Sequence, residues 1–152
     1  MTGVQTCALP ILQARSAAEA RSLVRRTMLA LALLAAPLAA VLLLWGPDLF
    51  TWIFGAQWAD AGALARGLGL YIGLHFIASP LSVVTLAWRA QPWALRLSLI
   101  GQVAFFTGLC AGLAFGGLQG GTWGVSAAMA AYFLYYFWTL AHWSNIPHES
   151  LA

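Results

Sequence analysis

Charged side chains are scarce in this chain of 152 residues: only 7% are charged, whereas 62% are hydrophobic. A soluble domain usually carries about 25% charged residues, so a chain with so few could not cover a globular surface in water. The few charges are also clumped, since no charged residue lies between Arg96 and Glu149. The composition excludes an ordinary soluble domain and indicates a membrane protein.

The signatures of catalysis and of metal binding are also missing. The sequence contains no HExxH motif, no Ser/His/Asp set and no Walker loop, and its four acidic residues lie outside the long apolar runs. Cys7 and Cys110 are far apart, which fits neither a disulfide nor a metal site. The arginines do not form one basic face, as a nucleic-acid-binding surface would require. We therefore expect no enzymatic activity, no metal, no cofactor and no nucleic-acid partner.

Residues 1–11 read MTGVQTCALPI and lack the basic start and long apolar core of a signal peptide. They resemble translated sequencing-adapter read-through, so they are left out of the fold prediction as a non-native leader. Their presence predicts that the natural N-terminal part of the protein is missing. Residues 12–26 have helical spacing and are expected to extend the first span into the cytoplasm. Residues 144–152 are expected to form a polar cytoplasmic tail.

Four apolar runs are long enough to cross a bilayer core of about 30 Å, which needs about 20 helical residues. They occupy approximately residues 28–45, 67–88, 94–115 and 122–143. The stretch between the first two is aromatic and weakly charged, which is typical of a membrane interface, and predicts a short interfacial helix around Gln57–Arg66. The predicted fold is an all-α membrane bundle, with four transmembrane helices within residues 27–143 and one short interfacial helix.

The basic residues predict the orientation of this bundle. Cytoplasmic loops of membrane proteins carry an excess of Arg and Lys. If the N-terminal segment is cytoplasmic, all but one of the seven basic residues fall on the cytoplasmic side, and Arg66 is the exception. The six cytoplasmic positions are Arg15, Arg21, Arg25, Arg26, Arg89 and Arg96. Both termini are therefore predicted to be cytoplasmic.

Small residues predict where the helices pack. Gly108, Gly112 and Gly116 repeat every four residues and form a smooth ridge that should meet another helix. Gly69 and Gly73 form a GxxxG pair with the same property.

A few polar residues in or beside the spans are candidate binding residues. An ionisable group such as His75 in a membrane helix indicates a functional site, although a neutral histidine bonded to a neighbouring helix explains it equally well. Arg89 and Arg96 could clamp a phosphate, whereas topology determination and lipid-headgroup contact are commoner roles. Gln102 could face a polar cavity or bond to another helix. Tyrosines between Tyr132 and Tyr136 could stack on sugar rings or form an interface belt.

The stretch Phe54–Pro80 carries a resemblance to a known family. An arginine-flanked helix is followed by FG-x-x-W-x-x-A, with Phe54, Gly55, Trp58 and Ala61, and then by a span entered with LARGLGLYIGLHFIASPLS. This pattern resembles the C-terminal part of polysaccharide-biosynthesis membrane proteins. These are lipid-linked oligosaccharide flippases of the multidrug/oligosaccharidyl-lipid/polysaccharide exporter superfamily.

The resemblance covers roughly residues 15 to 143. Members of the family often have acidic residues after the motif's glycine, where this chain has Ala56 and Gln57.

The resemblance implies a function in transport. Such proteins have two lobes with alternating access, and four spans would correspond to the end of the second lobe. The implied role is to flip lipid-linked saccharides across the bacterial inner membrane for lipopolysaccharide or exopolysaccharide export. The implied partners are membrane lipid, a lipid-linked oligosaccharide and the missing N-terminal helices. His75, Arg96, Arg89 and Gln102 are the expected substrate-binding residues. The alternatives are a multidrug or ion antiporter of the same superfamily and a non-transporting four-helix membrane subunit.

Overall fold

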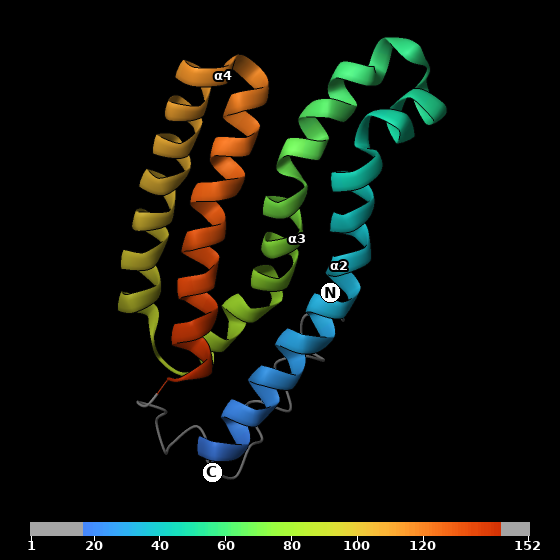
Figure 1. The fold of residues 1–152 in the computed structure, drawn as a ribbon. Coiled ribbons are helices and arrows are strands. Elements are labelled where there is room, and N and C mark those ends of the chain that lie inside the picture. The colour runs from blue at the N-terminus through green and yellow to red at the C-terminus, as the bar shows by residue number, and fades with distance from the viewer. Residues whose placement is uncertain (1–16, 144–152) are drawn as a thin grey trace.

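A computed structural model describes residues 17–143 and contains three long helices (Figure 1). Helix α2 spans Ala17–Phe54, α3 spans Ala59–Ala87 and α4 spans Gln91–Ala141, and a short 3-10 turn, η1, covers Ala56–Trp58. All three long helices are long and apolar enough to cross a membrane. The predicted all-α class is therefore confirmed for the described residues. The expected leader, Arg15 and the polar tail lie outside them.

Helix α4 is one element of 51 residues that folds back on itself. Gly116 (φ −145°) and Gly117 (φ 58°) depart from helical geometry inside it, and the positive φ of Gly117 suits a residue without a Cβ. The parts on either side of this bend run antiparallel, as the yellow-brown and orange-red ribbons of Figure 1 show. Residues 91–115 are called the first limb of α4 and residues 118–141 the second limb.

The helix count corrects the sequence prediction, because the described chain has three helices and not four plus an interfacial helix. The predicted spans 94–115 and 122–143 both belong to α4, since only two glycines between them leave the helical conformation. The interfacial helix predicted around Gln57–Arg66 is wrong. After η1, that stretch forms the first turns of α3, and no non-helical residue separates it from the rest of the helix.

Contact between two glycines explains why this stretch belongs to the bundle. A Cβ placed on Gly62 would lie 2.6 Å from the carbonyl oxygen of Gly46, and one on Gly46 would lie 2.7 Å from that of Gly62. The backbones of α2 and α3 therefore touch here, as small residues allow in membrane helices. Packing of this kind keeps the beginning of α3 against α2.

Helix α2 is interrupted at Trp45 (φ −122°, ψ 15°), where its backbone leaves helical geometry. Pro47 follows two residues later, and proline removes a backbone donor and crowds the preceding turn. Residues around Pro37, the other proline in the helix, keep helical dihedrals.

The chain reverses direction at Gly55, whose φ of 100° is accessible mainly to glycine. The Gly55 amide donates a hydrogen bond to the carbonyl oxygen of Thr51, and the Trp58 amide donates to the carbonyl oxygen of Gly55. The rings of Phe54 and Trp58 lie 5.8 Å apart across this turn. The FG-x-x-W part of the motif is therefore explained by the geometry of the turn itself.

Glycines also bring the two limbs of α4 into backbone contact. A Cβ on Gly108 would lie 2.6 Å from the carbonyl oxygen of Gly124, and one on Gly112 would collide with the carbonyl of Gly120. The predicted ridge is thus confirmed at Gly108 and Gly112. It is wrong at Gly116, where nothing lies within 4 Å of an added Cβ because this residue is in the bend.

The GxxxG pair of α3 also packs against another helix, as predicted. A Cβ on Gly69 would lie 3.2 Å from Leu43, and one on Gly73 would lie 2.9 Å from Ala39. Both neighbours belong to α2, which packs along α3 and touches α4 little.

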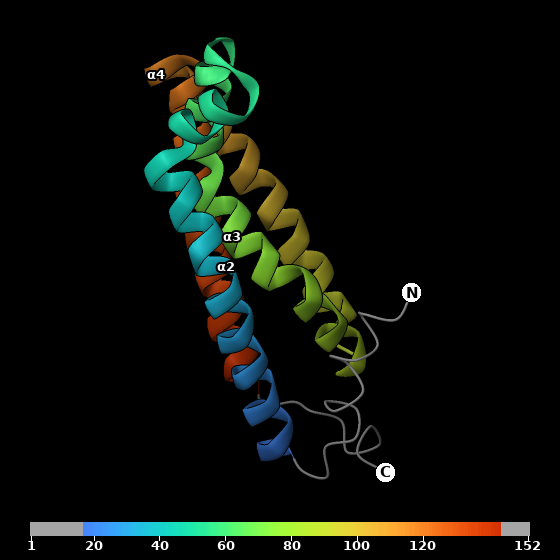
Figure 2. The same cartoon turned by 90° about the vertical axis from the view of Figure 1, so that its right-hand side faces the viewer.

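The most deeply buried side chains gather where the two described ends of the chain meet. Ala20, Val24 and Leu140 expose none of their surface. Nearby, an Arg25 Nη2 atom donates to the carbonyl oxygen of Ala141 at 3.0 Å. Figures 1 and 2 show the beginning of α2 and the end of α4 at one end of the bundle, and the α2–α3 turn and the α4 bend at the other.

Candidate functional site

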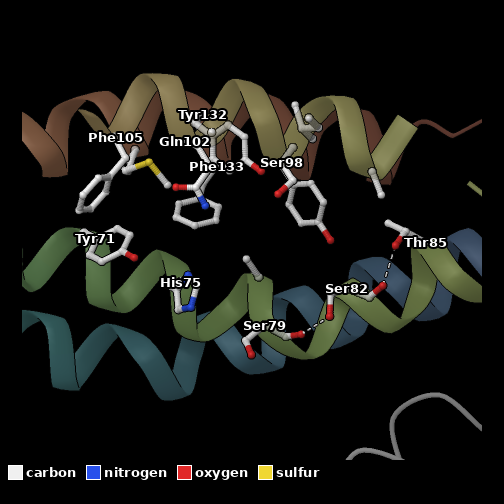
Figure 3. A pocket seen from close by; sticks show the side chains of 16 residues that line it. Tyr71, His75, Ser79, Ser82, Thr85, Ser98, Gln102, Phe105, Tyr132 and Phe133 are labelled. Carbon is white, nitrogen blue, oxygen red and sulfur yellow. Dashed lines mark hydrogen bonds between the residues drawn. The ribbon is translucent and has the colours of Figure 1, made fainter. Parts of the chain in front are cut away.

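A groove of about 570 Å³ lies between α3 and both limbs of α4 (Figure 3). We call it the α3–α4 groove. Helix α2 contributes none of its walls. The wall of α3 is formed by Tyr71, His75, Ala78, Ser79, Ser82 and Thr85. The first limb of α4 contributes Ala94, Leu97, Ser98, Gly101, Gln102 and Phe105, and the second limb contributes Met129, Tyr132, Phe133 and Tyr136.

The groove differs in character along its length. At one end, Tyr71 lies 6.1 Å from Phe105 and 6.4 Å from Phe133, measured between ring centroids. Towards the other end lie four hydroxyl-bearing residues, as Figure 3 shows. They are Ser79, Ser82, Thr85 and Ser98. We call the first the aromatic end and the second the hydroxyl end.

His75 lies at the aromatic end and packs against aromatic rings. Its ring is 5.6 Å from Tyr71 and 5.9 Å from Phe133, and the side chain is exposed. Within residues 17–143 its ring nitrogens form no hydrogen bond, so the described helices do not supply the polar partner of a structural histidine. A second hollow of about 350 Å³ on the next face of α3 shares Tyr71, His75 and Ser79 with the groove.

Two hydroxyl groups at the hydroxyl end bond to their own helix. Ser82 Oγ donates to the carbonyl oxygen of Ser79, and Thr85 Oγ1 donates to that of Ser82, each at 2.7 Å (Figure 3). A hydroxyl group has one proton and two lone pairs. These two side chains therefore reach the groove as hydrogen-bond acceptors.

Packed aromatic rings adjoin the end of the groove that lies nearer to the end of α4 at Ala141. Trp93 stacks on Tyr136 with centroids 6.0 Å apart and planes 14° from parallel, and it meets Trp143 edge-on at 4.9 Å. Because Tyr136 also lines the groove, this cluster fixes the position of one wall residue.

The structure brings together two of the four predicted binding residues. His75 and Gln102 both line the groove, from α3 and from the first limb of α4. Arg89 and Arg96 are not among its lining residues: Arg89 occupies the turn between α3 and α4, and Arg96 is an exposed residue near the start of α4. Whether any of the four binds a substrate stays a prediction.

The prediction missed most of the hydroxyl end. A signal for it is present in α3, where Tyr71, His75, Ser79, Ser82 and Thr85 follow each other at intervals of three or four residues. Such spacing places side chains on one face of a helix. A polar stripe in an otherwise apolar span indicates a wall that does not face lipid.

The groove contains no Asp, Glu, Lys or Arg among its lining residues. Within the part of the chain that the structure describes, no three His, Cys, Asp or Glu residues come together as a possible metal site.

Comparison with known proteins finds no relative: no family model, curated protein or solved structure matches the chain.

Proposed function

We propose that this chain is the C-terminal part of a membrane transporter that flips lipid-linked saccharides across the bacterial inner membrane. The observation that carries the proposal is the α3–α4 groove, an uncharged, hydroxyl-bearing and aromatic-lined cavity in a chain that is otherwise strongly apolar. Polar groups in hydrocarbon are costly and mark the pathways of substrates. Ligand sites typically combine apolar walls with a few placed polar groups, as this groove does.

The membrane arrangement that we propose has four crossings. Helix α4 has 51 residues and would be about 75 Å long if straight, at 1.5 Å per residue, whereas the bilayer core is about 30 Å thick. Its bend at Gly116–Gly117 lets each limb cross once. Together with α2 and α3, this gives four crossings and returns the second described end to the side of the first.

The positions of the arginines support cytoplasmic termini. Arg21, Arg25 and Arg26 lie in the first turns of α2, Arg89 lies in the α3–α4 turn and Arg96 lies near the start of α4. These segments share one end of the bundle (Figure 1). Arg66 lies in the opposite half, beside Gly46. Cytoplasmic enrichment of arginine therefore favours the end that holds the beginning of α2 and the end of α4 as the cytoplasmic one.

The outer faces of the helices fit contact with lipid. Leu33 is 76% exposed and Phe115 is 94% exposed. Large apolar side chains on such a scale form patches that a soluble monomer rarely shows. In a bilayer they need no further cover.

The groove has walls from α3 and α4 alone, so we propose that further helices of the same transporter supply the remaining wall. Transporters of this type bind substrate between two repeats or bundles. A polar cargo needs such a lined passage because an unsatisfied polar group in hydrocarbon costs several kcal/mol.

The chemistry of the groove favours a saccharide over the cation of an antiporter. Cation sites in membrane transporters commonly use carboxylates, and none lines this groove. Hydroxyl, amide and imidazole groups can match the donors and acceptors of a sugar without a charge.

A complementation experiment tests the proposal. Cells that lack their own flippase would receive the chain joined to its upstream region, or residues 12–152 alone. We expect the joined form to restore surface polysaccharide and residues 12–152 alone to fail. Restoration by residues 12–152 alone would contradict the need for further helices. Failure of the joined form, when it is inserted and stable, would contradict the flippase function.

A further inference from the structure

The geometry points to a specific ligand chemistry at the hydroxyl end of the α3–α4 groove: it binds a neutral, hydroxyl-bearing group, such as a sugar ring, in preference to a phosphate. The inference rests on the proposed function, because it assigns the groove to one part of the proposed ligand. Lipid-linked saccharides contain both groups, so the assignment fixes which part lies here.

The first step is the direction of the hydrogen bonds. Ser82 Oγ and Thr85 Oγ1 each give their single proton to a backbone carbonyl of α3 at 2.7 Å. Each then offers only lone pairs to the groove. A sugar hydroxyl can donate to these oxygens. An ionised phosphate, whose oxygens mainly accept, gains no hydrogen bond from these two side chains and depends on other donors of the groove, such as Ser98 and Gln102.

The second step is the absence of charge. A buried anion is stabilised by paired cations or by several donors aimed at it. The sixteen residues that line the groove include no Arg or Lys. An anion at the hydroxyl end would therefore gain no charged partner from the α3 or α4 residues that line the groove.

The third step concerns two side chains across the groove that can both donate and accept hydrogen bonds. Ser98 and Gln102 lie on the first limb of α4, facing the α3 wall in Figure 3. Neither side chain bonds to another described residue. Both can donate and accept, so they complement a ligand that also does both, as a sugar does.

The test uses the full chain in phosphatidylcholine nanodiscs and a photoreactive probe. The probe is an alkyl β-D-glucoside with a diazirine next to the glycosidic oxygen, and labelled peptides are mapped by mass spectrometry. Competitors are the unlabelled alkyl glucoside and an alkyl phosphate with the same chain. We expect labelling of the groove segments of α3 and α4, competition by the glucoside and little competition by the phosphate.

The variant arm removes the acceptors. Ser82→Ala together with Thr85→Val should weaken labelling by roughly ten-fold, since the loss of one neutral hydrogen bond corresponds to a factor of about 2 to 10. The control is Ser22→Ala, because Ser22 makes the same type of bond, to the Glu19 carbonyl, far from the groove. Measurements of helical content and thermal stability show whether each variant is folded. The competition experiment in the unchanged protein tests the inference even if a variant fails to fold.

Each outcome decides the inference. Competition by the alkyl phosphate equal to that by the glucoside, or no glucoside labelling of the groove, would overturn it. Sugar-selective labelling combined with failed complementation would overturn the proposed function and leave the ligand chemistry of the groove standing. Phosphate competition combined with successful complementation would overturn the ligand chemistry of the groove and leave the proposed function standing.

Discussion

The hydroxyl of Ser126 donates a hydrogen bond of 2.6 Å to the carbonyl oxygen of Gly67, and so joins the second limb of α4 to α3. Ser126 is 1% exposed, and its oxygen also accepts from the Tyr71 amide at 3.4 Å. A Cβ on Gly67 would collide with Thr122 of the same limb, so the helices approach closely at this level. Because Tyr71 begins the groove one turn later, this contact fixes the aromatic end.

Replacement of Ser126 by alanine should destabilise the bundle. The carbonyl of Gly67 would lose a buried partner, and hydrogen bonds between membrane helices are worth about 0.6 kcal/mol on average and up to about 2. Thermal unfolding in detergent measures the change. Ser98→Ala is the control, since Ser98 is exposed and forms no bond to the described residues. Equal midpoints for the two variants would show that the Ser126 bond does not hold the helices together.

Two glycines of α4 that look alike in the sequence should respond differently to alanine. Gly112→Ala places a methyl group against the backbone of Gly120, whereas the methyl group of Gly116→Ala meets nothing within 4 Å. We expect Gly112→Ala to cost about 1 to 3 kcal/mol, as overpacking does. Gly116→Ala should cost much less. Thermal unfolding of both variants is the measurement, and a larger loss at Gly116 would contradict the antiparallel packing of the limbs.

Arg89 holds a backbone conformation that favours glycine, with φ of 50°. The Ala90 amide donates to the carbonyl oxygen of Thr85, and the Arg89 amide donates to the carbonyl oxygen of Leu86. These two bonds are the pattern of a Schellman motif. Arg89→Gly should therefore be more stable than Arg89→Ile by about 1 to 2 kcal/mol. Both variants remove the arginine side chain, so their difference isolates the backbone. Equal stability would contradict the left-handed turn.

The proposed four crossings predict the readings of reporter fusions. Fusions after Gly55 and after Gln119 should report an external position, because these residues lie at or near the α2–α3 turn and the α4 bend. Fusions after Gln91 and after Ala152 should report a cytoplasmic position. A cytoplasmic reading at Gln119 would mean that the limbs of α4 do not both cross.

The sequence predicted the helical class and the glycine contacts because both depend on local composition and spacing. It failed at Gln57–Arg66 because the aromatic pattern of an interface is also the pattern of a packed turn. Phe54 and Trp58 contact each other there, and Gly62 then packs against Gly46. The sequence shows that His75 lies within an apolar span. Its position beside Phe133 depends on how α3 and α4 pack, which the sequence does not show. The hydrogen bonds of Ser82 and Thr85 depend on side-chain torsions that no sequence pattern fixes.

The central claim is that the α3–α4 groove is a polar cavity open to water and not a surface covered by lipid. Cysteine labelling tests it most directly, in a background with Cys7→Ser and Cys110→Ser. Ser98→Cys would place a thiol in the groove, and Leu99→Cys one residue further on would place it outside, where Leu99 is 61% exposed.

A charged, membrane-impermeant maleimide reacts with thiolates, which form in water and not in hydrocarbon. Applied from the side that we propose to be cytoplasmic, it should label Ser98→Cys at a rate close to that of Gln91→Cys, which is the exposed first residue of α4 and serves as the positive control. Leu99→Cys should stay unlabelled. Labelling of Leu99→Cys as fast as that of Ser98→Cys, or no labelling of Ser98→Cys, would contradict the account.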